Sequence, residues 1–417
     1  MAGPDGRVLG RGLAGYPVRV PAPGQAESAP EDWWLATRAA VREALAEADR
    51  VSVTALAVAG QMHGVVLVDE AGAPLRPAIL GLDQRAAAEA ASYAELPCEH
   101  TAVIGNAPSP GLAGPLLCWL MTHEPGTVRA AWWALQPKDW LRLRLTGPAA
   151  TDPTDGSGTL LFDLAGNDWA DPLIGKLGVP REKLPPVRDS AGVAGPLLPG
   201  PAAELGLYRG IPVAVGAADT AAALLASGLG TDEALLNLGR GGQWVVRETA
   251  FRPAGTTNLY RAVGGGYYRL APARNVGVTL DWVRSLLGAT WEELYAAASR
   301  PRRPDAPRFD PCLSPESWTP ATASSAAAGA WAGLRLAHER EDLMRSALDG
   351  VAALLRRRLD DLRAAGHAPR RVILSGGGTA NPAWRSLLAE TLGLPLRDAP
   401  AAWLTPAGAA RLAAEAR

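Results

Sequence analysis

The sequence has few cysteines and no long apolar run, and both absences narrow the class of protein. Its three cysteines, Cys98, Cys118 and Cys312, are far apart, with no C-x-x-C or Cys/His spacing that would hold zinc or an iron–sulfur cluster. We interpret them as small buried hydrophobic residues. No apolar stretch reaches the roughly 18 residues of a membrane-spanning helix, and the N-terminus does not combine basic residues with an apolar run. We therefore expect a cytoplasmic protein without a membrane partner.

An excess of charge of one sign is also absent. The chain has 41 Lys and Arg residues against 42 Asp and Glu residues, a net charge of −1. Such a balance predicts no broad affinity for nucleic acid or for anionic membranes. Because 417 residues exceed the size at which one hydrophobic core keeps growing, we expect two packed domains with a cleft between them.

Helical and strand patterns alternate along the first half of the chain. Residues 31–49 have apolar positions at helical spacing, and residues 54–59 read as a buried strand. A second apolar run, residues 211–215, is followed by Asp219 and by a helix of small residues to about Ser227. Alternating strands and helices predict an α/β fold, in which ligands lie beyond the carboxyl ends of strands.

The second half begins with a pattern typical of a hairpin. Residues 234–238 and 243–247 are apolar runs on either side of a glycine-rich turn. Residues 301–332 are rich in Pro, Ser and Ala, which predicts a long surface loop. The leucines and valine between Leu348 and Leu362 then mark an amphipathic helix.

Several segments carry a specific family resemblance. They read Ala59-Gly-Gln-Met-His-Gly64, Asp83-Gln-Arg85, Pro137-Lys-Asp139 and Gly216-Ala-Ala-Asp219. In order and spacing they resemble the FGGY family of carbohydrate kinases, and especially its xylulokinase-like members. The resemblance implies two actin-like (ribonuclease H-like) ATPase domains around a cleft, a sugar-binding domain over residues 1–228 and a nucleotide-binding domain over 229–417. It also implies the cofactors ATP and Mg²⁺, and phosphorylation of a ketopentose such as D-xylulose.

The resemblance assigns roles in the sugar half of the site. It implies that Asp219 is the general base, since a positioned carboxylate that accepts a hydroxyl proton makes that hydroxyl a better nucleophile. The alternative for one Asp after a strand is a helix N-cap. Sugar contacts are expected from Gln61, Met62, His63 and Thr220. By itself, a histidine such as His63 is more often a structural histidine, and Gln61 is equally typical of a side chain that bonds only to backbone.

Two glycine-rich turns are the candidates for nucleotide binding. One contains Gly239, Arg240 and Gly241, where the family has a Gly-Thr-Ser turn, so that Arg240 replaces a hydroxyl and would either pair with phosphate or block its place. The other contains Gly376, Gly377 and Gly378, followed by Asn381 at the start of a helix, and resembles an adenosine-binding turn.

The resemblance also implies an N-terminal hairpin with an Asp-[Leu/Ile]-Gly-Thr turn, which this sequence does not show. Asp5-Gly6 looks instead like a hairpin turn, and residues 7–18 like its outgoing strand. We expect that residues 54–59 are left with an unpaired edge, or that residues 7–18 shift inward to pair with them.

Three interpretations remain open from the sequence. The chain is a pentulose kinase whose true start lies upstream, a sugar-binding protein without catalysis, or a non-functional remnant. No metal ligands are assigned, and a homodimer is one assembly that the sequence leaves open.

Overall fold

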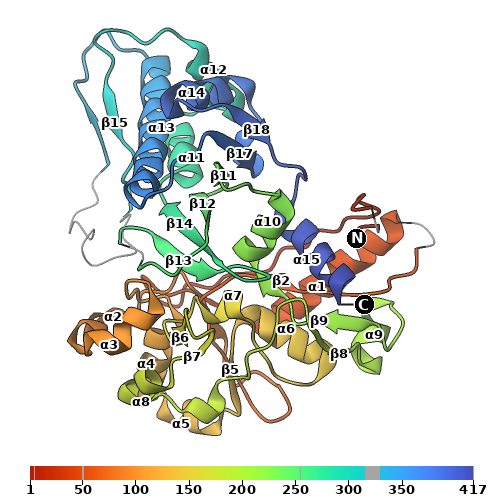
Figure 1. Cartoon of the computed structure of the whole chain (residues 1–417). Coiled ribbons are helices and arrows are strands. Elements are labelled where there is room, and N and C mark those ends of the chain that lie inside the picture. Colours follow the sequence, from red (N-terminus) through yellow and green to blue (C-terminus); the bar gives the residue numbers. More distant parts are fainter. Residues whose placement is uncertain (4, 49–50, 254, 315–328, 417) are drawn as a thin grey trace.

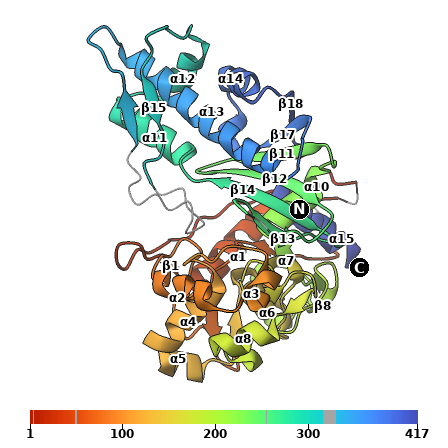
Figure 2. The same cartoon turned by 60° about the vertical axis from the view of Figure 1, so that its left-hand side comes forward.

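The structure is a computed structural model that describes residues 1–3, 5–48, 51–253, 255–314 and 329–416. Figure 1 shows two lobes, the lower one in red to yellow and the upper one in green to blue. Helices α10 (Asp219–Ser227) and α15 (Leu404–Glu415) pack against each other at the junction. Figure 2 shows the same division from another side. The predicted α/β class with two domains is confirmed, and no helix in the described ranges is long and apolar enough to cross a membrane.

The first predicted helix is present as α1 (Pro30–Glu47). Pro30 occupies its first turn, where the missing proline N–H leaves no backbone partner unsatisfied. Trp33 and Trp34, which are 4% and 1% exposed, anchor it to the lobe. The helix was expected to run to Asp49, which lies outside the described residues.

The strand expected over residues 54–59 is much shorter than predicted. Only Ala59–Gly60 (β2) forms a strand, preceded by an isolated bridge between Leu56 and Val213. In the described part of the chain, residues 54–60 hydrogen-bond through one edge only, to residues 212–218. All of residues 54–59 are at least partly exposed, so the prediction of a buried strand is wrong, and the expected unpaired edge is observed.

The N-terminal residues do not move inward to cover this edge. The turn at Asp5-Gly6 forms, with a bridge between Ala2 and Val8, but residues 7–18 make no strand. The N–H groups of Arg11 and Leu13 instead donate to the carboxylates of Glu47 and Glu43, 2.6 and 2.9 Å away on α1. Because side chains of α1 satisfy these amides, the segment lies along the helix rather than in a sheet.

The upper lobe is built on a six-stranded sheet with the order β13-β14-β12-β11-β17-β18. The expected hairpin is present as the antiparallel pair β11 (Glu233–Leu238) and β12 (Gly242–Glu248). The sheet continues with four more strands, which are β13 (Asn258–Arg261), β14 (Tyr267–Ala273), β17 (Arg371–Ser375) and β18 (Leu396–Asp398).

One face of this sheet packs against the long helix α13 (Arg340–Ala364), which confirms the amphipathic helix predicted between Leu348 and Leu362. The same core includes α11 (Gly277–Leu286), α12 (Trp291–Ala296) and α14 (Pro382–Leu392).

Two other expectations need correction. Residues 301–332 are not a plain loop, because β15 (Arg308–Asp310) pairs with β16 (Ala330–Ala332); residues 315–328 lie outside the described residues. Cysteines were expected to be buried, but Cys98 is exposed and Cys118 and Cys312 are only partly buried.

The lower lobe has short strands joined by helices. Its elements near the site are β3 (Val66–Val68), β5 (Trp133–Leu135), α6 (Pro137–Thr146), α7 (Pro153–Gly156), β9 (Pro212–Ala214) and β10 (Ala217–Ala218). The others are β1 (Glu27–Ser28), β4 (Ala78–Ile79), α2 (Ala87–Ser92), α3 (Cys98–Thr101), α4 (Ala113–His123), α5 (Pro125–Ala130), β6 (Phe162–Asp163), β7 (Asp168–Trp169), α8 (Asp171–Leu177), β8 (Val193–Pro196) and α9 (Pro199–Leu205).

The close approach of α10 and α15 generates a prediction about Gly408. A Cβ at Gly408 would lie 1.9 Å from the carbonyl oxygen of Ala222, so Gly408→Ala must push the helices apart. We expect it to lower the free energy of unfolding by about 2 kcal/mol, a typical cost of overpacking. Gly175→Ala is the matched control, because Gly175 lies in helix α8 with nothing within 4 Å of an added Cβ.

Gly175→Ala should be neutral or stabilising by up to about 1 kcal/mol, since alanine favours helix more than glycine does. Urea denaturation of both variants measures the difference. Equal effects of the two substitutions would contradict the tight helix contact.

Candidate active site

Two neighbouring parallel strands bring the predicted sugar loop and the predicted base together. Ala59 and Gly60 of β2 pair in parallel with Ala217 and Ala218 of β10. The loop that contains His63 follows the first strand, and Asp219 follows the second. Because both strands run in the same direction, these residues leave the same end of the pair. Ligands of α/β proteins bind at such strand ends.

His63 is held in an uncommon backbone conformation by two hydrogen bonds. Its φ is +78°, in the left-handed region. Its backbone N–H donates to Oε1 of Gln136 at 3.0 Å, and its Nδ1 lies 2.8 Å from the carbonyl oxygen of Gly158. A carbonyl only accepts, so Nδ1 carries the proton and the neutral ring has an unprotonated Nε2. Burial lowers the pKa of His63 to about 4, and the hydrogen bond to Gly158 opposes this only in part.

Side chains of the upper lobe also contact this loop. The hydroxyl of Tyr268 on β14 lies 3.6 Å from Sδ of Met62, and the ring of Tyr260 on β13 is centred 5.9 Å from the ring of His63. Met62, Tyr260 and Tyr268 are all buried in one hydrophobic cluster that joins both lobes. The two tyrosines were not predicted, because nothing in the local sequence of an antiparallel strand indicates which residue of another domain it meets.

Asp219 is the first residue of helix α10, and the N-cap position belongs to Ala218. Its Oδ1 accepts hydrogen bonds from the backbone N–H and the hydroxyl of Thr220. The side chain is partly buried, and desolvation raises the pKa of Asp219 while the bonds from Thr220 lower it. The carboxylate is therefore fixed in direction through one oxygen, without capping the helix in the usual way.

The remaining sugar-side candidates differ in their surroundings. Thr220 is buried, and its hydroxyl is directed to Asp219. Gln61 is partly buried in the loop between β2 and His63.

The two glycine-rich turns lie side by side in the upper lobe. β11 and β17 pair in parallel, so the turn after each strand leaves the same end of the sheet. A Cβ at Gly376 would lie 2.3 Å from the carbonyl oxygen of Leu238, and one at Gly378 3.2 Å from Cβ of Leu238. The second turn therefore rests on the residue that precedes Gly239.

Arg240 and Asn381 show what these turns offer a ligand. Arg240 is exposed, so its guanidinium is not held in the core. Oδ1 of Asn381 accepts from the N–H groups of Ala383 and Trp384, which makes Asn381 the N-cap of α14. Gly377 lies in the short 3₁₀ turn between Gly376 and Asn381.

The residues present fit a magnesium ion that arrives with a nucleotide, rather than a resident metal. Among the described residues, no group of three or more His, Cys, Asp or Glu side chains is arranged to hold a metal ion. Nucleotide-bound Mg²⁺ needs only one or two carboxylates, because phosphates and water complete its coordination. Asp219 is a carboxylate of this kind.

Comparison with known proteins covers nearly the whole chain. Residues 2–226 match the N-terminal domain of the FGGY family of carbohydrate kinases, and residues 245–417 match its C-terminal domain. The xylulose kinase of Escherichia coli (strain K12) is 34% identical over 98% of this chain and 85% of its own length. That of Bacillus subtilis (strain 168) is 28% identical over 93% of this chain and 79% of its own length.

Solved structures agree with these matches. A xyloylose kinase from Brucella ovis superposes with a TM-score of 0.89 at 29% identity, over 100% of this chain and 87% of its own. The xylulose kinase from Rhodospirillum rubrum gives a TM-score of 0.82 at 30% identity, over 96% and 84%.

The environment of His63 predicts how stability depends on pH. An ordinary histidine takes up a proton below about pH 6.5 when the chain is unfolded, but folded His63 does so only near pH 4. The contribution of neutral His63 to the free energy of unfolding is therefore fully present above pH 6.5 and is lost as the pH falls from 6.5 toward 4. Between pH 7 and pH 5 the free energy of unfolding should fall by about 1 to 2 kcal/mol more in the wild type than in His63→Asn.

Asparagine is the matched replacement, because it tolerates a positive φ and keeps an N–H donor for Gly158. Denaturant titrations at several pH values measure the two slopes. Identical slopes would show that His63 is not protected from protonation.

Proposed function

The chain belongs to the FGGY family of carbohydrate kinases, and we propose that its substrate is a ketopentose such as D-xylulose and that Asp219 is the general base. ATP-dependent phosphorylation of a sugar is the activity of this family, and the chain is a carbohydrate kinase. The choice of a ketopentose is supported by the similarity to xylulose kinases. We further propose residues 1–228 and 229–417 as its domains, the cytoplasm as its compartment and a homodimer as its assembly.

The observation that carries the proposal is the parallel pairing of β2 with β10. It presents the segment from Gln61 to His63 and the carboxylate of Asp219 at one end of two adjacent strands. A kinase needs such an arrangement, because the base must reach the hydroxyl of a sugar that other groups hold still.

The two oxygens of Asp219 have different roles in this proposal. Oδ1 is engaged by the backbone and hydroxyl of Thr220, which fix the orientation of the carboxylate. Oδ2 takes the proton of the attacking sugar hydroxyl as the hydroxyl oxygen bonds to the γ-phosphorus of ATP. The bond from that phosphorus to the bridging oxygen breaks, and ADP leaves. A carboxylate in partly desolvated surroundings is a stronger base than one in water, and the raised pKa of Asp219 is consistent with this role. Thr220 is then an orienting residue rather than a direct sugar contact.

His63 and Met62 form the wall against which the sugar is placed. In its neutral form His63 donates through Nδ1 to Gly158, so that Nε2 is the atom that accepts a hydrogen bond from a sugar hydroxyl. Met62 supplies an adaptable apolar surface, and the hydroxyl of Tyr268 fixes its sulfur. Gln61 is the polar residue at the entrance of the same loop.

The nucleotide is proposed to bind across the two turns of the upper lobe. Backbone N–H groups at Gly241 and Gly377 are the proposed partners for phosphate and ribose, because glycine lets a ligand approach the backbone closely. The N–H of Gly239 instead donates to the carbonyl of Gly241 at 2.9 Å and closes the turn. The exposed Arg240 is the cation for the phosphates. Asp219 is the carboxylate that would hold a magnesium ion bound with ATP, and the ion would neutralise charge on the phosphates.

A substitution at Asp219 tests the assignment of the base. Asp219→Asn keeps the size of the side chain but removes its basicity, so turnover should fall at least about a hundredfold while sugar affinity changes by no more than a few-fold. Sugar-dependent ATP consumption and equilibrium binding measure the two quantities. Turnover close to that of the wild type would exclude Asp219 as the base.

Calorimetric titration tests the substrate and the role of His63 in one series. D-xylulose should bind the wild type, and ATP with Mg²⁺ should bind the same sample. His63→Ala should weaken xylulose binding by about 1 to 3 kcal/mol, because a hydroxyl loses its partner in a closed site, and should leave nucleotide affinity unchanged. Sugar binding without nucleotide binding would select a non-catalytic sugar-binding protein, with Arg240 blocking the phosphate position.

A further inference from the structure

Beneath the strand pair β2 and β10, one lysine is enclosed by three aspartates. Nζ of Lys138 lies 2.6 Å from Asp139, 3.0 Å from Asp152 and 3.2 Å from Asp155. All four residues are fully buried, with no exposed surface. Buried charges of this kind are costly unless they are paired and balanced, so the group, which we name the Lys138 cage, calls for an explanation.

The charges of the cage do not balance if every group is ionised. Arg142 on the same helix is also fully buried and close enough to sense the charges of Asp139 and Asp152. Its guanidinium donates to the backbone carbonyls of Pro148 and Ala150. Arg188, whose charge Arg142 also senses, is exposed to solvent. Two buried positive groups then face three buried carboxylates, which leaves one negative charge without a buried partner. One proton within the cage restores neutrality.

The carboxylates of the cage differ in the hydrogen bonds that they accept. Oδ2 of Asp152 accepts from Thr154 and from Ser190, and Oδ1 of Asp139 accepts from Lys138. Oδ2 of Asp155 and Oδ1 of Asp152 are ion-paired with Nζ of Lys138, 3.2 and 3.0 Å away, whereas Oδ1 of Asp155 and Oδ2 of Asp139 have no partner among the described residues. A protonated Asp155 supplies a second donor beside the Lys138 ammonium to a group in which these two buried carboxylate oxygens have none.

The cage is joined by hydrogen bonds to the peptide before the proposed base. Thr154 donates its hydroxyl proton to Oδ2 of Asp152 at 2.6 Å, and the same hydroxyl oxygen accepts from the backbone N–H of Ala218 at 2.8 Å. Ala218 directly precedes Asp219. The position of Asp219 therefore depends on a hydroxyl that the cage orients.

The cage also reaches the sugar loop. Gln136, the N-cap of α6, accepts from the N–H of His63, and Lys138 follows two residues later. A Cβ at Gly60 would lie 2.8 Å from Cβ of Lys138, so the stem of the lysine packs directly against β2. A Cβ at Gly216, just before β10, would lie 3.4 Å from Cδ of the same lysine, so this helix turn lies against β2 and against the residue that leads into β10.

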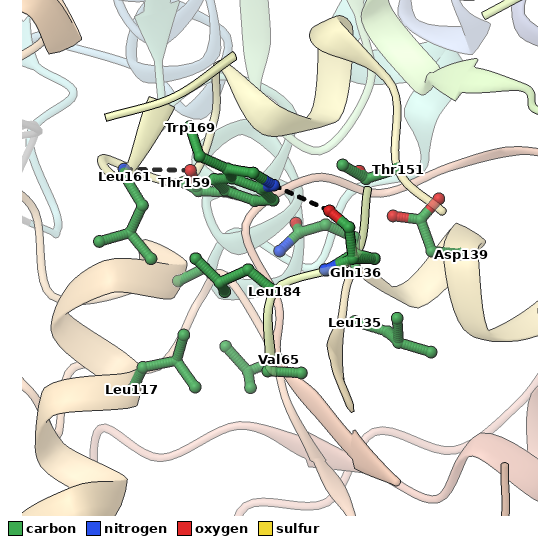
Figure 3. Close-up of a pocket in the computed structure, with 13 residues that line it drawn as sticks. Val65, Leu117, Leu135, Gln136, Asp139, Thr151, Thr159, Leu161, Trp169 and Leu184 are labelled. Atoms are coloured by element: carbon green, nitrogen blue, oxygen red, sulfur yellow. Dashed lines mark hydrogen bonds between the residues drawn. The ribbon is translucent and has the colours of Figure 1, made fainter. Parts of the chain in front are cut away.

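A small cavity next to the cage has polar groups directed toward it. Figure 3 shows Asp139, Gln136 and Thr151 around this cavity, with Trp169 opposite. Its volume is about 10 Å³, the space of one water molecule. Oδ2 of Asp139 and Oγ1 of Thr151 have no partner among the described residues, and a water in the cavity would satisfy both.

We propose that the Lys138 cage is a positioning unit that fixes the peptide before Asp219, and that Asp155 within it carries a proton in the folded enzyme. The role in catalysis rests on the proposed function of Asp219. Lys138, Asp155 and Thr154 are positioning residues here, since they act through Ala218 and not on the sugar.

The surroundings of Asp155 favour its neutral form. Lys138 and Asp139 face it from α6, Asp152 from the residue before α7, and Tyr268 from β14. Burial raises the pKa of Asp155 well above its ordinary value, Lys138 opposes this shift, and the two carboxylates add to it.

The other charged side chains on elements that pack on α7 do not face Asp155. Arg261 on β13 lies over the ring of Tyr267 and donates to the carbonyl of Leu164, and Asp168 on β7 is exposed. His63, which bonds to Gly158 just after α7, gains a proton only near pH 4.

The first experiment measures the link from the cage to Asp219. Thr154→Val replaces the hydroxyl by a methyl group of similar size, and Thr154→Ser keeps it. Thr154→Val should lower kcat about tenfold or more with little change in the KM for D-xylulose, because a small misplacement of a base slows the chemical step. Thr154→Ser should restore kcat. Hydrogen exchange of the Ala218 amide should be faster in Thr154→Val only.

The second experiment measures the proton on Asp155 and needs no catalysis. A carboxyl that stays protonated in the folded state stabilises that state at low pH, and the stabilisation is lost as pH rises from about 4 toward the folded pKa. Relative to Asp155→Asn, which is neutral at every pH, the folding equilibrium constant of the wild type should fall tenfold per pH unit over this window. A constant ratio from pH 5 to pH 8 would show that Asp155 is ionised, and would overturn the proposal.

The two experiments also separate the proposal from the function on which it rests. If the wild type phosphorylates no sugar, the proposed function fails, whereas amide exchange and the pH dependence of stability still decide whether the cage positions Ala218. If kinase activity is present and Thr154→Val changes neither kcat nor the exchange of Ala218, the positioning role is wrong.

Lys138→Met combined with Asp155→Asn should fold less stably than Asp155→Asn alone, because two buried carboxylates then lack their ammonium. Equal stability of these two variants would also contradict the cage.

Discussion

The parallel pairing of Ala59 and Gly60 with Ala217 and Ala218 is the constraint on which the candidate site depends. It is only two residues long, so its stability must come from what packs around it. On one side α10 and α15 cover it, and beneath it lies Lys138 with its three carboxylates. Tertiary contacts therefore set the positions of both strand ends. The loop with His63 and the residue Asp219 follow these ends directly, so the same contacts position them.

Burial has different consequences at the strand ends and in the layer below them. At the strand ends, partial burial keeps His63 neutral and makes Asp219 more basic, which suits groups that accept protons or hydrogen bonds. One layer below, full burial forces the charges of the cage into pairs. The buried ion pairs of the cage can therefore hold the proposed base, Asp219, in position without pairing its own carboxylate with a cation, which would lower its basicity.

The contact between the lobes adds a second constraint. Met62 contacts Tyr268 and His63 contacts Tyr260, so the loop proposed to bind sugar is packed against the sheet that carries the turns proposed to bind nucleotide. A shift of the upper lobe therefore changes the surroundings of the sugar loop directly. Arg240 and the turn at Gly376 lie at one end of the same sheet, so the proposed sugar loop and the proposed nucleotide turns are both attached to it.

The sequence by itself determined the α/β class, a first helix beginning near residue 31, the β11–β12 hairpin and the strand end at Asp219, because local periodicity and glycine turns encode them. A resemblance then indicated His63 and Asp219. Only the tertiary structure decided that residues 54–60 pair through one edge, that Cys98 is exposed, and that Lys138 meets Asp139, Asp152 and Asp155. These features arise between segments distant in sequence, where burial and partner geometry, and not local propensity, set the outcome.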